Sequence, residues 1–362
     1  MKKHLALFLC IYATGLTSFA RENKEITKNL KGAFTSEVFQ LSGFGQIAGI
    51  VSEHPNQGLA NPATNSSFDI AKARLTAAGK LGNKKQFGYL LMYDFEHTAR
   101  LQELYGEWLP ADAISVRFGQ YSIPFTIENQ MSPSRIETVH FSRSVDAMAG
   151  SSGDFNQFEH GGGIKGKAGR DAGLQVSGRL FKKDDFFHIE YLTGLFNGTG
   201  LNTKDNNNRK DFIGTVYYYP VKALRIGGSV YFGKLDTPAR NDIPSAVQGK
   251  HGRNLWTVGA ECNSKKFYAR TEYISGNNGG LEREGYYGSA VWKFAPDKWE
   301  VLGKYEYYDK DKSIKDNEIS DITVGVNYHL AYLTYIQLNY IYTDNKIDGT
   351  NSAVVMQLQV FF

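Results

Sequence analysis

Residues 353–362, at the end of the chain, read AVVMQLQVFF. Apolar side chains take every second position of this stretch, and most of the others are small or polar. Successive side chains of a β-strand point to opposite faces, so the stretch predicts a strand with one continuous apolar face. That face carries Val354, Met356, Leu358, Val360 and Phe362, and the opposite face carries Ala353, Val355, Gln357, Gln359 and Phe361.

The same alternation recurs through the chain from about residue 39, in segments of roughly ten residues separated by polar connections. Residues 87–96, 174–180 and 299–307 are clear examples, with aromatic or aliphatic residues on one face and charged or small residues on the other. This repetition predicts an all-β protein that forms one large domain.

The lengths of the connections decide between a soluble sandwich and a membrane barrel. Short turns at 82–85, 182–185, 263–266 and 295–298 alternate with longer connections near 53–67, 197–210, 234–252 and 309–318. Outer-membrane barrels show this asymmetry, and only helices and closed barrels satisfy the backbone within lipid. The mature chain has no apolar run of the roughly 20 residues that a spanning helix needs. We therefore predict a transmembrane antiparallel β-barrel of about sixteen strands around an aqueous channel.

The beginning of the chain indicates export. Lys2 and Lys3 precede an apolar stretch, and small residues lead to Ala20, which is typical of a secretory signal peptide cleaved after that residue. The predicted organisation is a signal peptide at 1–20, a polar N-terminal periplasmic segment at 21–38 and an outer-membrane barrel at 39–362. Cleavage would leave Cys262 as the sole cysteine, so we expect no intramolecular disulfide.

The chain also limits its partners. Its end, Phe362, resembles the C-terminal strand by which the barrel assembly machinery recognises outer-membrane substrates. Lys and Arg number 41 against 37 Asp and Glu, a balance that gives no support to a nucleic-acid partner. The histidines lack metal-ligand spacing, and we predict no cofactor. The glycine-rich stretch 161–167 approaches a phosphate-binding loop, but Ala168 lacks the hydroxyl that would bind magnesium.

Several short motifs resemble the phosphate-selective porin O and P family. They are RFGQYSIPF at 117–125, Glu128, Arg143-Ser144, Phe196-Asn197-Gly198, Asp211 and Pro220. The resemblance implies a sixteen-stranded barrel, a homotrimer, and a long third loop, here about 122–171, that folds inward to narrow the pore. It also implies arginines and lysines that guide anions such as phosphate.

The charge pattern disagrees with strong anion selectivity. Alternation directs basic and acidic side chains toward the lumen in nearly equal number, and the third loop is mixed as well, so a cation beside a carboxylate presents little net field to an anion. Our candidate pore-lining and solute-binding residues are Arg74, Arg117, Arg135, Arg143, Lys165, Lys167 and Arg179. The predicted lumen charges are Lys72, Arg74, Lys80, Arg117, Arg179, Arg225, Arg270, Lys293 and Lys304, with Asp94, Glu96, Glu103, Glu107, Glu190, Glu261, Glu272 and Glu306.

The predicted function is passive diffusion of small hydrophilic solutes through a porin of the bacterial outer membrane, with phosphate among the candidate solutes. We do not expect an enzyme. The alternative is an occluded barrel that acts as a surface-interaction protein or as a hydrolase, for which Ser144, His140 and Asp146 on the third loop are the available side chains.

Overall fold

The computed structural model describes residues 38–53, 66–82, 84–96, 99–149, 169–205, 207–237, 249–295 and 298–362. The predicted signal peptide and nearly all of the polar segment 21–38 therefore lie outside the described residues, as do Lys165 and Lys167. None of the helices in the described ranges has the length and apolar character that a membrane span requires.

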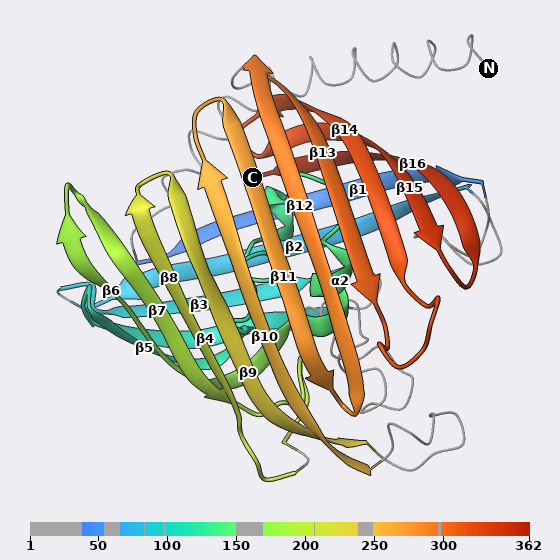
Figure 1. The fold of residues 1–362 in the computed structure, drawn as a ribbon. Helices are drawn as coiled ribbons and strands as arrows, with labels where there is room; N and C mark the ends of the chain where they lie inside the picture. Colours follow the sequence, from blue (N-terminus) through green and yellow to red (C-terminus); the bar gives the residue numbers. More distant parts are fainter. Residues whose placement is uncertain are drawn as a thin grey trace.

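Sixteen antiparallel strands form one closed barrel (Figure 1). Each strand pairs with the next one along the chain, and the last strand pairs with the first, so the sheet has no free edge. The strands are β1 (Gln40–Ser52), β2 (Ser66–Leu81), β3 (Phe87–Asp94), β4 (Arg100–Ala111), β5 (Ile114–Ser122), β6 (Arg170–Lys183), β7 (Phe186–Phe196), β8 (Asp211–Val221), β9 (Leu224–Thr237), β10 (Gly249–Asn263), β11 (Phe267–Asn278), β12 (Leu281–Ala295), β13 (Trp299–Asp309), β14 (Ile319–Ala331), β15 (Thr334–Asn345) and β16 (Gly349–Phe361).

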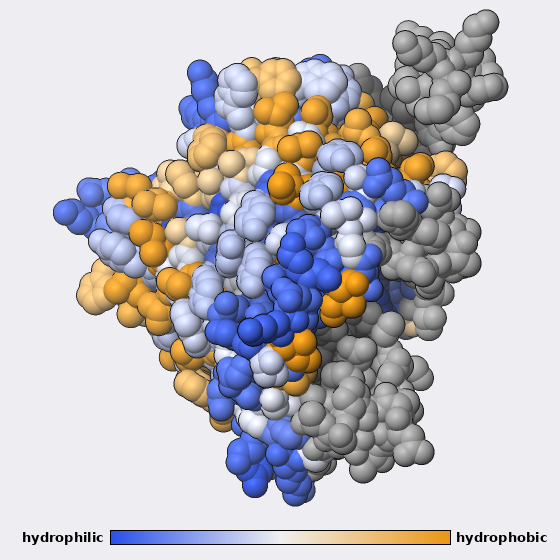
Figure 2. Space-filling view, turned by 45° about the vertical axis from the view of Figure 1, so that its right-hand side comes forward, coloured by the Kyte–Doolittle hydropathy of each residue, from blue (hydrophilic) through white to orange (hydrophobic). Residues whose placement is uncertain are grey.

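The predicted alternation is confirmed in the strand that ends the chain. Val354, Met356 and Val360 are exposed on the outer wall, whereas Val355 and Gln357 are buried on the inner side. The same division runs round the barrel, because a wall that faces lipid must be apolar while the opposite face meets the lumen. In Figure 2 orange and pale residues cover the upper part of the visible wall, and blue residues gather in the lower part.

Aromatic side chains gather at two levels of the outer wall. Trp299 packs against Tyr328 and Phe294 near the short turns, with ring centroids 4.5 and 6.5 Å apart. Tyr286 stacks on Tyr307 near the other end of the same strands, at 5.2 Å. Tyr307 lies about 27 Å along β13 from Trp299 at ~3.4 Å per residue. That separation is comparable with the apolar band, about 25 Å tall, that aromatic girdles bound in outer-membrane barrels.

Two predicted connections differ in length from the structure. β9 continues to Thr237 and β10 begins at Gly249, so the connection predicted at 234–252 is shorter, because Thr237 pairs with Gly249 and extends the hairpin. The third loop runs from residue 123 to residue 169, since Ser122 and Arg170 still pair as strand residues. The connections at 197–210 and 310–318 agree with the prediction.

Closure of the ring depends on a tight contact at the seam between β1 and β16. Gly43 exchanges two backbone hydrogen bonds with Phe362, at 2.8 and 2.9 Å. A Cβ atom on Gly43 would lie 2.6 Å from the Arg74 carbonyl oxygen and 2.6 Å from the Phe362 ring, whereas one on Gly45 would meet nothing within 4 Å.

We therefore expect Gly43→Ala to lower the temperature at which the folded barrel unfolds. The added methyl group must displace backbone as well as the terminal ring, and such overpacking costs roughly 1–3 kcal/mol. The measurement is the temperature at which the folded band converts to the unfolded band on a detergent gel. Gly45→Ala is the matched control and should behave as the wild type. Equal unfolding temperatures for the two variants would contradict this packing.

Candidate functional site: the loop-lined channel

The third loop enters the barrel and lies along the inner wall. It contains a short 3-10 helix, η2 (Pro133–Arg135), and about two turns of α-helix, α2 (Arg143–Ala149). Figure 1 shows α2 within the ring of strands, and its contacts are with β11, β12 and β13. The described residues of the loop, 123–149, therefore lie against the inner side of the barrel.

Side-chain amides of the inner wall hold the middle of the loop. Asn339 on β15 accepts from the backbone N–H of Val139 at 2.9 Å, and Gln337 donates to the Glu137 carbonyl at 2.9 Å. On β16, Gln359 donates to the Ser134 carbonyl at 3.1 Å. These amides satisfy backbone groups of an irregular segment that has no sheet partners of its own.

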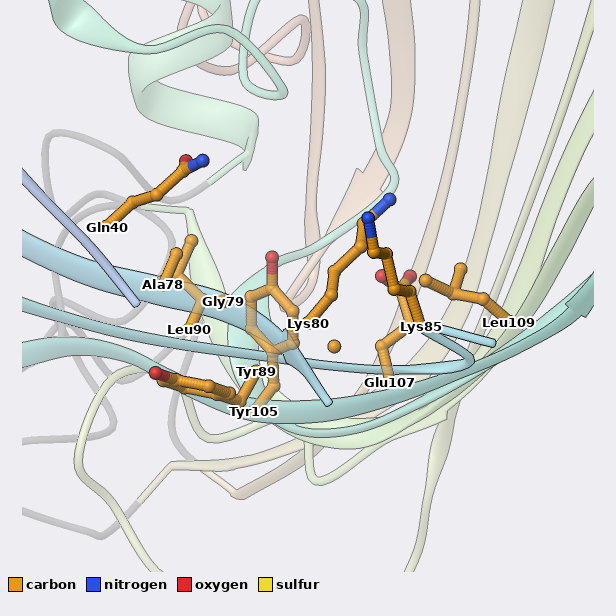
Figure 3. Close-up of a pocket in the computed structure, with 11 residues that line it drawn as sticks. Gln40, Ala78, Gly79, Lys80, Lys85, Tyr89, Leu90, Tyr105, Glu107 and Leu109 are labelled. Carbon is orange, nitrogen blue, oxygen red and sulfur yellow. The ribbon is translucent and has the colours of Figure 1, made fainter. Parts of the chain in front are cut away.

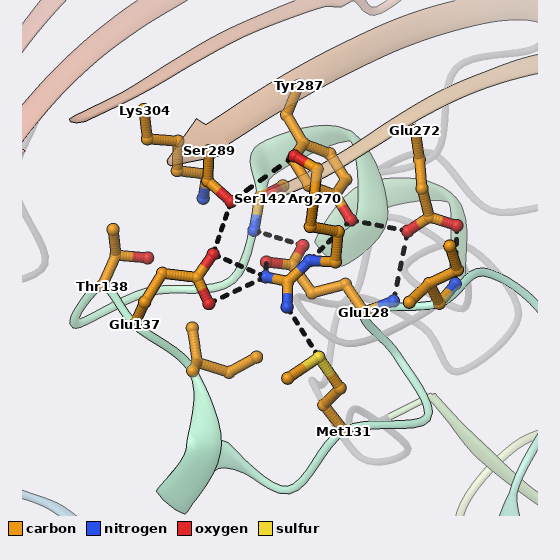
Figure 4. A network of polar contacts seen from close by, with 12 residues as sticks. Glu128, Met131, Glu137, Thr138, Ser142, Arg270, Glu272, Tyr287, Ser289 and Lys304 are labelled. Atoms are coloured by element: carbon orange, nitrogen blue, oxygen red, sulfur yellow. Dashed lines mark hydrogen bonds and ion pairs between the residues drawn. The ribbon is translucent and has the colours of Figure 1, made fainter. Parts of the chain in front are cut away.

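A buried ionic network anchors the loop to β11 and β12 (Figure 4). Arg270 is buried, and its Nη2 donates to Glu128 Oε1 at 2.8 Å and to Glu137 Oε1 at 2.9 Å. Ser289 Oγ also donates to Glu137, at 2.6 Å. One guanidinium therefore neutralises two loop carboxylates at once. Burial opposes ionisation of Glu137, but the charge of Arg270 outweighs it and lowers the pKa of this carboxyl.

Glu272 extends the network to the start of the loop. Its carboxylate accepts from the backbone N–H of Glu128 at 3.1 Å and from the hydroxyl of Tyr287 at 2.7 Å. The Arg270 Nε donates to the same Tyr287 oxygen at 3.0 Å. Wall and loop thus share one connected set of hydrogen bonds, as Figure 4 shows.

Helix α2 is seated on the wall by apolar packing. Val145 and Met148 are fully buried in a cluster with Leu255 and Ile274, inward-facing residues of β10 and β11. Gly285 on β12 permits the close approach, because a Cβ atom there would lie 2.5 Å from the Cβ of Ser144. Together with the amides of β15 and β16, this packing places the loop against the inner wall from β10 round to β16.

The described residues also enclose open space on another part of the wall. Two cavities of about 380 and 570 Å³ lie against β2 to β7, and they share Lys80, Lys85 and Leu109 as lining residues. Arg117 and Arg179 line the larger of the two. Both cavities lie toward the short-turn end of the wall formed by β2 to β7, where Lys80, Lys85 and Leu109 are found.

The structure places the predicted site residues in different settings. Arg74 is buried, and its Nε lies 2.9 Å from Asp94 Oδ2. Arg117 lies 2.9 Å from Glu107, and its guanidinium stacks on the Tyr105 ring, 4.3 Å from the ring centroid. Arg143 contacts Asp321 on β14 through two bonds of 2.7 and 3.0 Å. Arg179 pairs with Asp112 at 3.0 Å, exposed at the short-turn end, and Arg135 is exposed on η2.

The structure thus brings Arg117 and Arg179 to one cavity, and it places Arg143 on a different wall. Arg143 is held against β14, whereas Arg117 belongs to β5. Sequence reasoning missed the anchoring role of Arg270, Glu128 and Glu137. Their charges were visible, but no spacing in the sequence indicates that residues more than a hundred positions apart form one network.

Ion pairs account for most of the charge that alternation directs to the lumen. Within the described residues most basic side chains of the inner wall and loop lie beside carboxylates, with Lys80 and Arg135 as exceptions. The pairs are Lys72 with Glu96, Arg74 with Asp94, Arg117 with Glu107, Arg143 with Asp321, Arg170 with Glu103, Arg225 with Glu261, Arg270 with Glu128 and Glu137, and Lys304 with Glu306.

The side chains considered for a hydrolase do not form a nucleophile and base pair. Ser144 Oγ and His140 Nε2 each lack a hydrogen-bond partner among the described residues. Ser144 instead contributes its Cβ to the contact with Gly285.

A closed sixteen-stranded antiparallel barrel with an apolar outer wall and an inserted loop is the architecture of outer-membrane porins. The family model described as phosphate-selective porin O and P matches residues 56–239, just over half of the chain. The chain therefore belongs to the phosphate-selective porin O and P family. Family and fold together indicate a passive porin of the bacterial outer membrane, a channel rather than an enzyme.

Solved structures share the fold at low sequence identity. The anion-selective porin from Comamonas acidovorans is 15% identical, with 90% of this chain and 99% of that chain covered and a TM-score of 0.64. The outer membrane channel DcaP of Acinetobacter baumannii is 12% identical, with 91% and 99% covered and a TM-score of 0.61. OmpT of Vibrio cholerae is 12% identical, with the same coverage and a TM-score of 0.57. A comparison with curated protein sequences gives no match.

The Arg270 network predicts a measurable effect on the channel. We expect Arg270→Met to leave Glu128 and Glu137 buried without their cation, which costs ~3–5 kcal/mol when one partner of a buried pair is removed. The loop should detach, and single-channel currents in a planar bilayer should become larger and noisier. Adding Glu128→Gln and Glu137→Gln to the same variant should restore steady currents. Wild-type currents from Arg270→Met alone would show that other contacts hold the loop.

Asp146 on α2 predicts a dependence on pH. Burial, and after it the negative charge of Glu128, raises the pKa of the Asp146 carboxyl to about 7. Lys304, Glu306 and Arg143 also face it. Because this pKa is raised above the ordinary value of 3.8, the seated helix favours the protonated carboxyl, and the stabilisation present below about pH 4 is lost as pH rises through 7.

Loop fluctuations should therefore increase as the pH rises from about 5 to about 8, a range that brackets the raised pKa of Asp146. The measurement is open-channel current noise as a function of pH. Asp146→Asn keeps the shape of the side chain without its charge, and its current noise should stay low over the whole pH range. A variant with the same pH profile as the wild type would assign the effect to another group.

Proposed function

We propose that small hydrophilic solutes diffuse through the space between the third loop and the wall formed by β2 to β7. The observation that carries this proposal is the one-sided seating of the loop, which covers inner-wall residues of β11 to β16 and leaves the cavities along β2 to β7. A loop held by buried ion pairs and amides narrows the passage to a constant width, so solute size is limited without any moving part.

The selectivity that we propose is a modest preference for anions. Neutralised pairs such as Arg74 with Asp94 contribute little net field to the channel, since the two opposite charges lie within 3 Å. Arg135 is exposed on the loop, and no ion pair joins it to another described residue. Lys165 and Lys167 lie outside the described residues and stay candidates for solute contact. Because most described cations are paired and few, such as Arg135 and Lys80, are not, we propose that the excess positive charge is small.

This proposal predicts a weak dependence of current on anion identity. In a potassium chloride gradient across a planar bilayer, the reversal potential should lie on the anion side of zero but closer to zero than to the chloride equilibrium potential. Phosphate at low millimolar concentration should block chloride current weakly, because paired cations are not available to bind it. The measurements are reversal potential and block, on the same channels.

Two variants separate the contributions. Arg135→Ala removes a cation that has no ion pair, whereas Arg143→Ala exposes the Asp321 carboxylate, so both should shift the reversal potential toward cation preference. The absence of discrete conductance steps would contradict the open channel. Strong phosphate block that disappears in the double variant would contradict the weak preference and would establish a phosphate-selective channel.

The remaining proposals concern assembly. We propose that the barrel assembly machinery recognises the last strand through Phe362, whose ring is 66% exposed at the end of the outer wall. We also propose a homotrimer, as the family resemblance implies, with export directed by a signal peptide at residues 1–20. Chemical cross-linking of the detergent-extracted protein would distinguish a trimer from a monomer.

A further inference from the structure

Register places inward-facing side chains of β1 to β4 in a row across the wall. Gln40 is opposite Ala78, Ala78 is opposite Leu90, and Leu90 is opposite Tyr105. We call Ala78, Leu90 and Tyr105 the apolar row. Apolar residues in this position are unusual, because the inner face of a channel-forming barrel is normally polar.

The apolar row differs from the other apolar residues of the inner wall. Leu255 and Ile274 also face inward, but the third loop covers them, and they are at most 1% exposed. Leu90 and Tyr105 are only half-buried, and together with Ala78 they line the cavity of about 380 Å³. Part of their apolar surface is therefore presented to this cavity, although the Tyr105 ring also contacts that of Tyr121, with centroids 5.7 Å apart.

A charged row lies next to the apolar row. Lys80 lies two residues from Ala78 on β2 and is opposite Gly88 on β3. Gly88 is in turn opposite Glu107 on β4, and Glu107 is opposite Arg117 on β5. Residues two apart on a strand are separated by about 7 Å and share a face. Figure 3 shows Gln40, Ala78 and Lys80 projecting from the wall to the same side.

Lys80 supplies positive charge at this place. It is exposed, and no ion pair joins it to another residue in the described ranges. Arg117 is paired with Glu107, yet its guanidinium lies over the Tyr105 ring and so connects the two rows. The wall thus offers a lysine whose backbone lies about 7 Å along β2 from Ala78, next to a patch of leucine and tyrosine surface.

We propose that this part of the wall is a binding subsite for small organic anions that carry a carboxylate and a hydrocarbon body. The carboxylate contacts Lys80, and the body lies on Leu90 and Tyr105. Inorganic phosphate is polar on all sides and gains nothing from the apolar row. The inference rests on the proposed function, since the solute must enter the same channel, and it adds the class of solute.

The test is a series of linear carboxylates of equal charge, from acetate to hexanoate, as blockers of chloride current in a planar bilayer at neutral pH. Full burial of one methylene group is equivalent to about a fourfold change in binding, and half burial to about twofold. We expect block by the wild type to strengthen about twofold with each methylene group. Phosphate should block no better than acetate.

Three variants identify the residues. Leu90→Ser should remove most of the dependence on chain length, and Lys80→Gln should weaken block by all carboxylates to a similar degree. Leu91→Ser is the matched control, because Leu91 is the next residue on β3 and lies on the outer wall, 41% exposed. It should keep the chain-length dependence of the wild type.

The outcomes separate this inference from the proposed function. A protein without conductance steps in potassium chloride would contradict the channel itself. A conducting channel whose block is independent of chain length would overturn only the subsite. A dependence on chain length that persists in Leu90→Ser would also overturn it, since the apolar contact would then lie elsewhere, for example in the lipid.

Discussion

Hydrogen bonding of every backbone group within lipid is the constraint on which this structure depends. A strand ring satisfies it only when the last strand pairs with the first, as Phe362 and Gly43 do at the seam. Once the ring is closed, each residue faces either lipid or lumen, and its neighbour faces the opposite way. The distribution of apolar and polar side chains, the position of the aromatic levels and the existence of an enclosed channel all follow from this division.

A second constraint organises the interior. The backbone groups of an irregular segment within a barrel need hydrogen-bond partners, but the segment has no neighbouring strand to supply them. The third loop obtains its hydrogen bonds from inward-facing side chains, with neutral amides such as Asn339 at its middle and the Arg270 network beside it. Buried ion pairs contribute little to stability compared with well-packed apolar residues, but leaving one partner alone is costly. The pairs thus restrict the loop to one position more than they strengthen the fold.

The sequence was sufficient to predict features set by local periodicity. The outer face of residues 353–362 and the closed antiparallel barrel agree with the structure, because lipid imposes the same period of two on every strand. The inward loop was expected from the family resemblance alone. The placement of the loop was beyond such reasoning. Glu128 and Glu137 meet Arg270 from 142 and 133 positions away, and a mixed charge composition does not say which carboxylate meets which cation. Leu255 and Ile274 face inward although the inner face is expected to be polar, because α2 covers them. The signal peptide, the trimer and the solute contacts remain predictions.

The off-centre position of the loop has a consequence for how such a channel can change during evolution. One arc of the ring, from β11 to β16, is committed to holding the loop, and a substitution there disturbs the bore itself. The arc from β2 to β7 borders the two cavities and carries side chains such as Leu90 and Lys80 that take no part in the Arg270 network. Substitutions on the arc from β2 to β7 can therefore change the permeability while the loop contacts on the other arc stay the same. A single architecture can in this way serve bacteria that live on different nutrients.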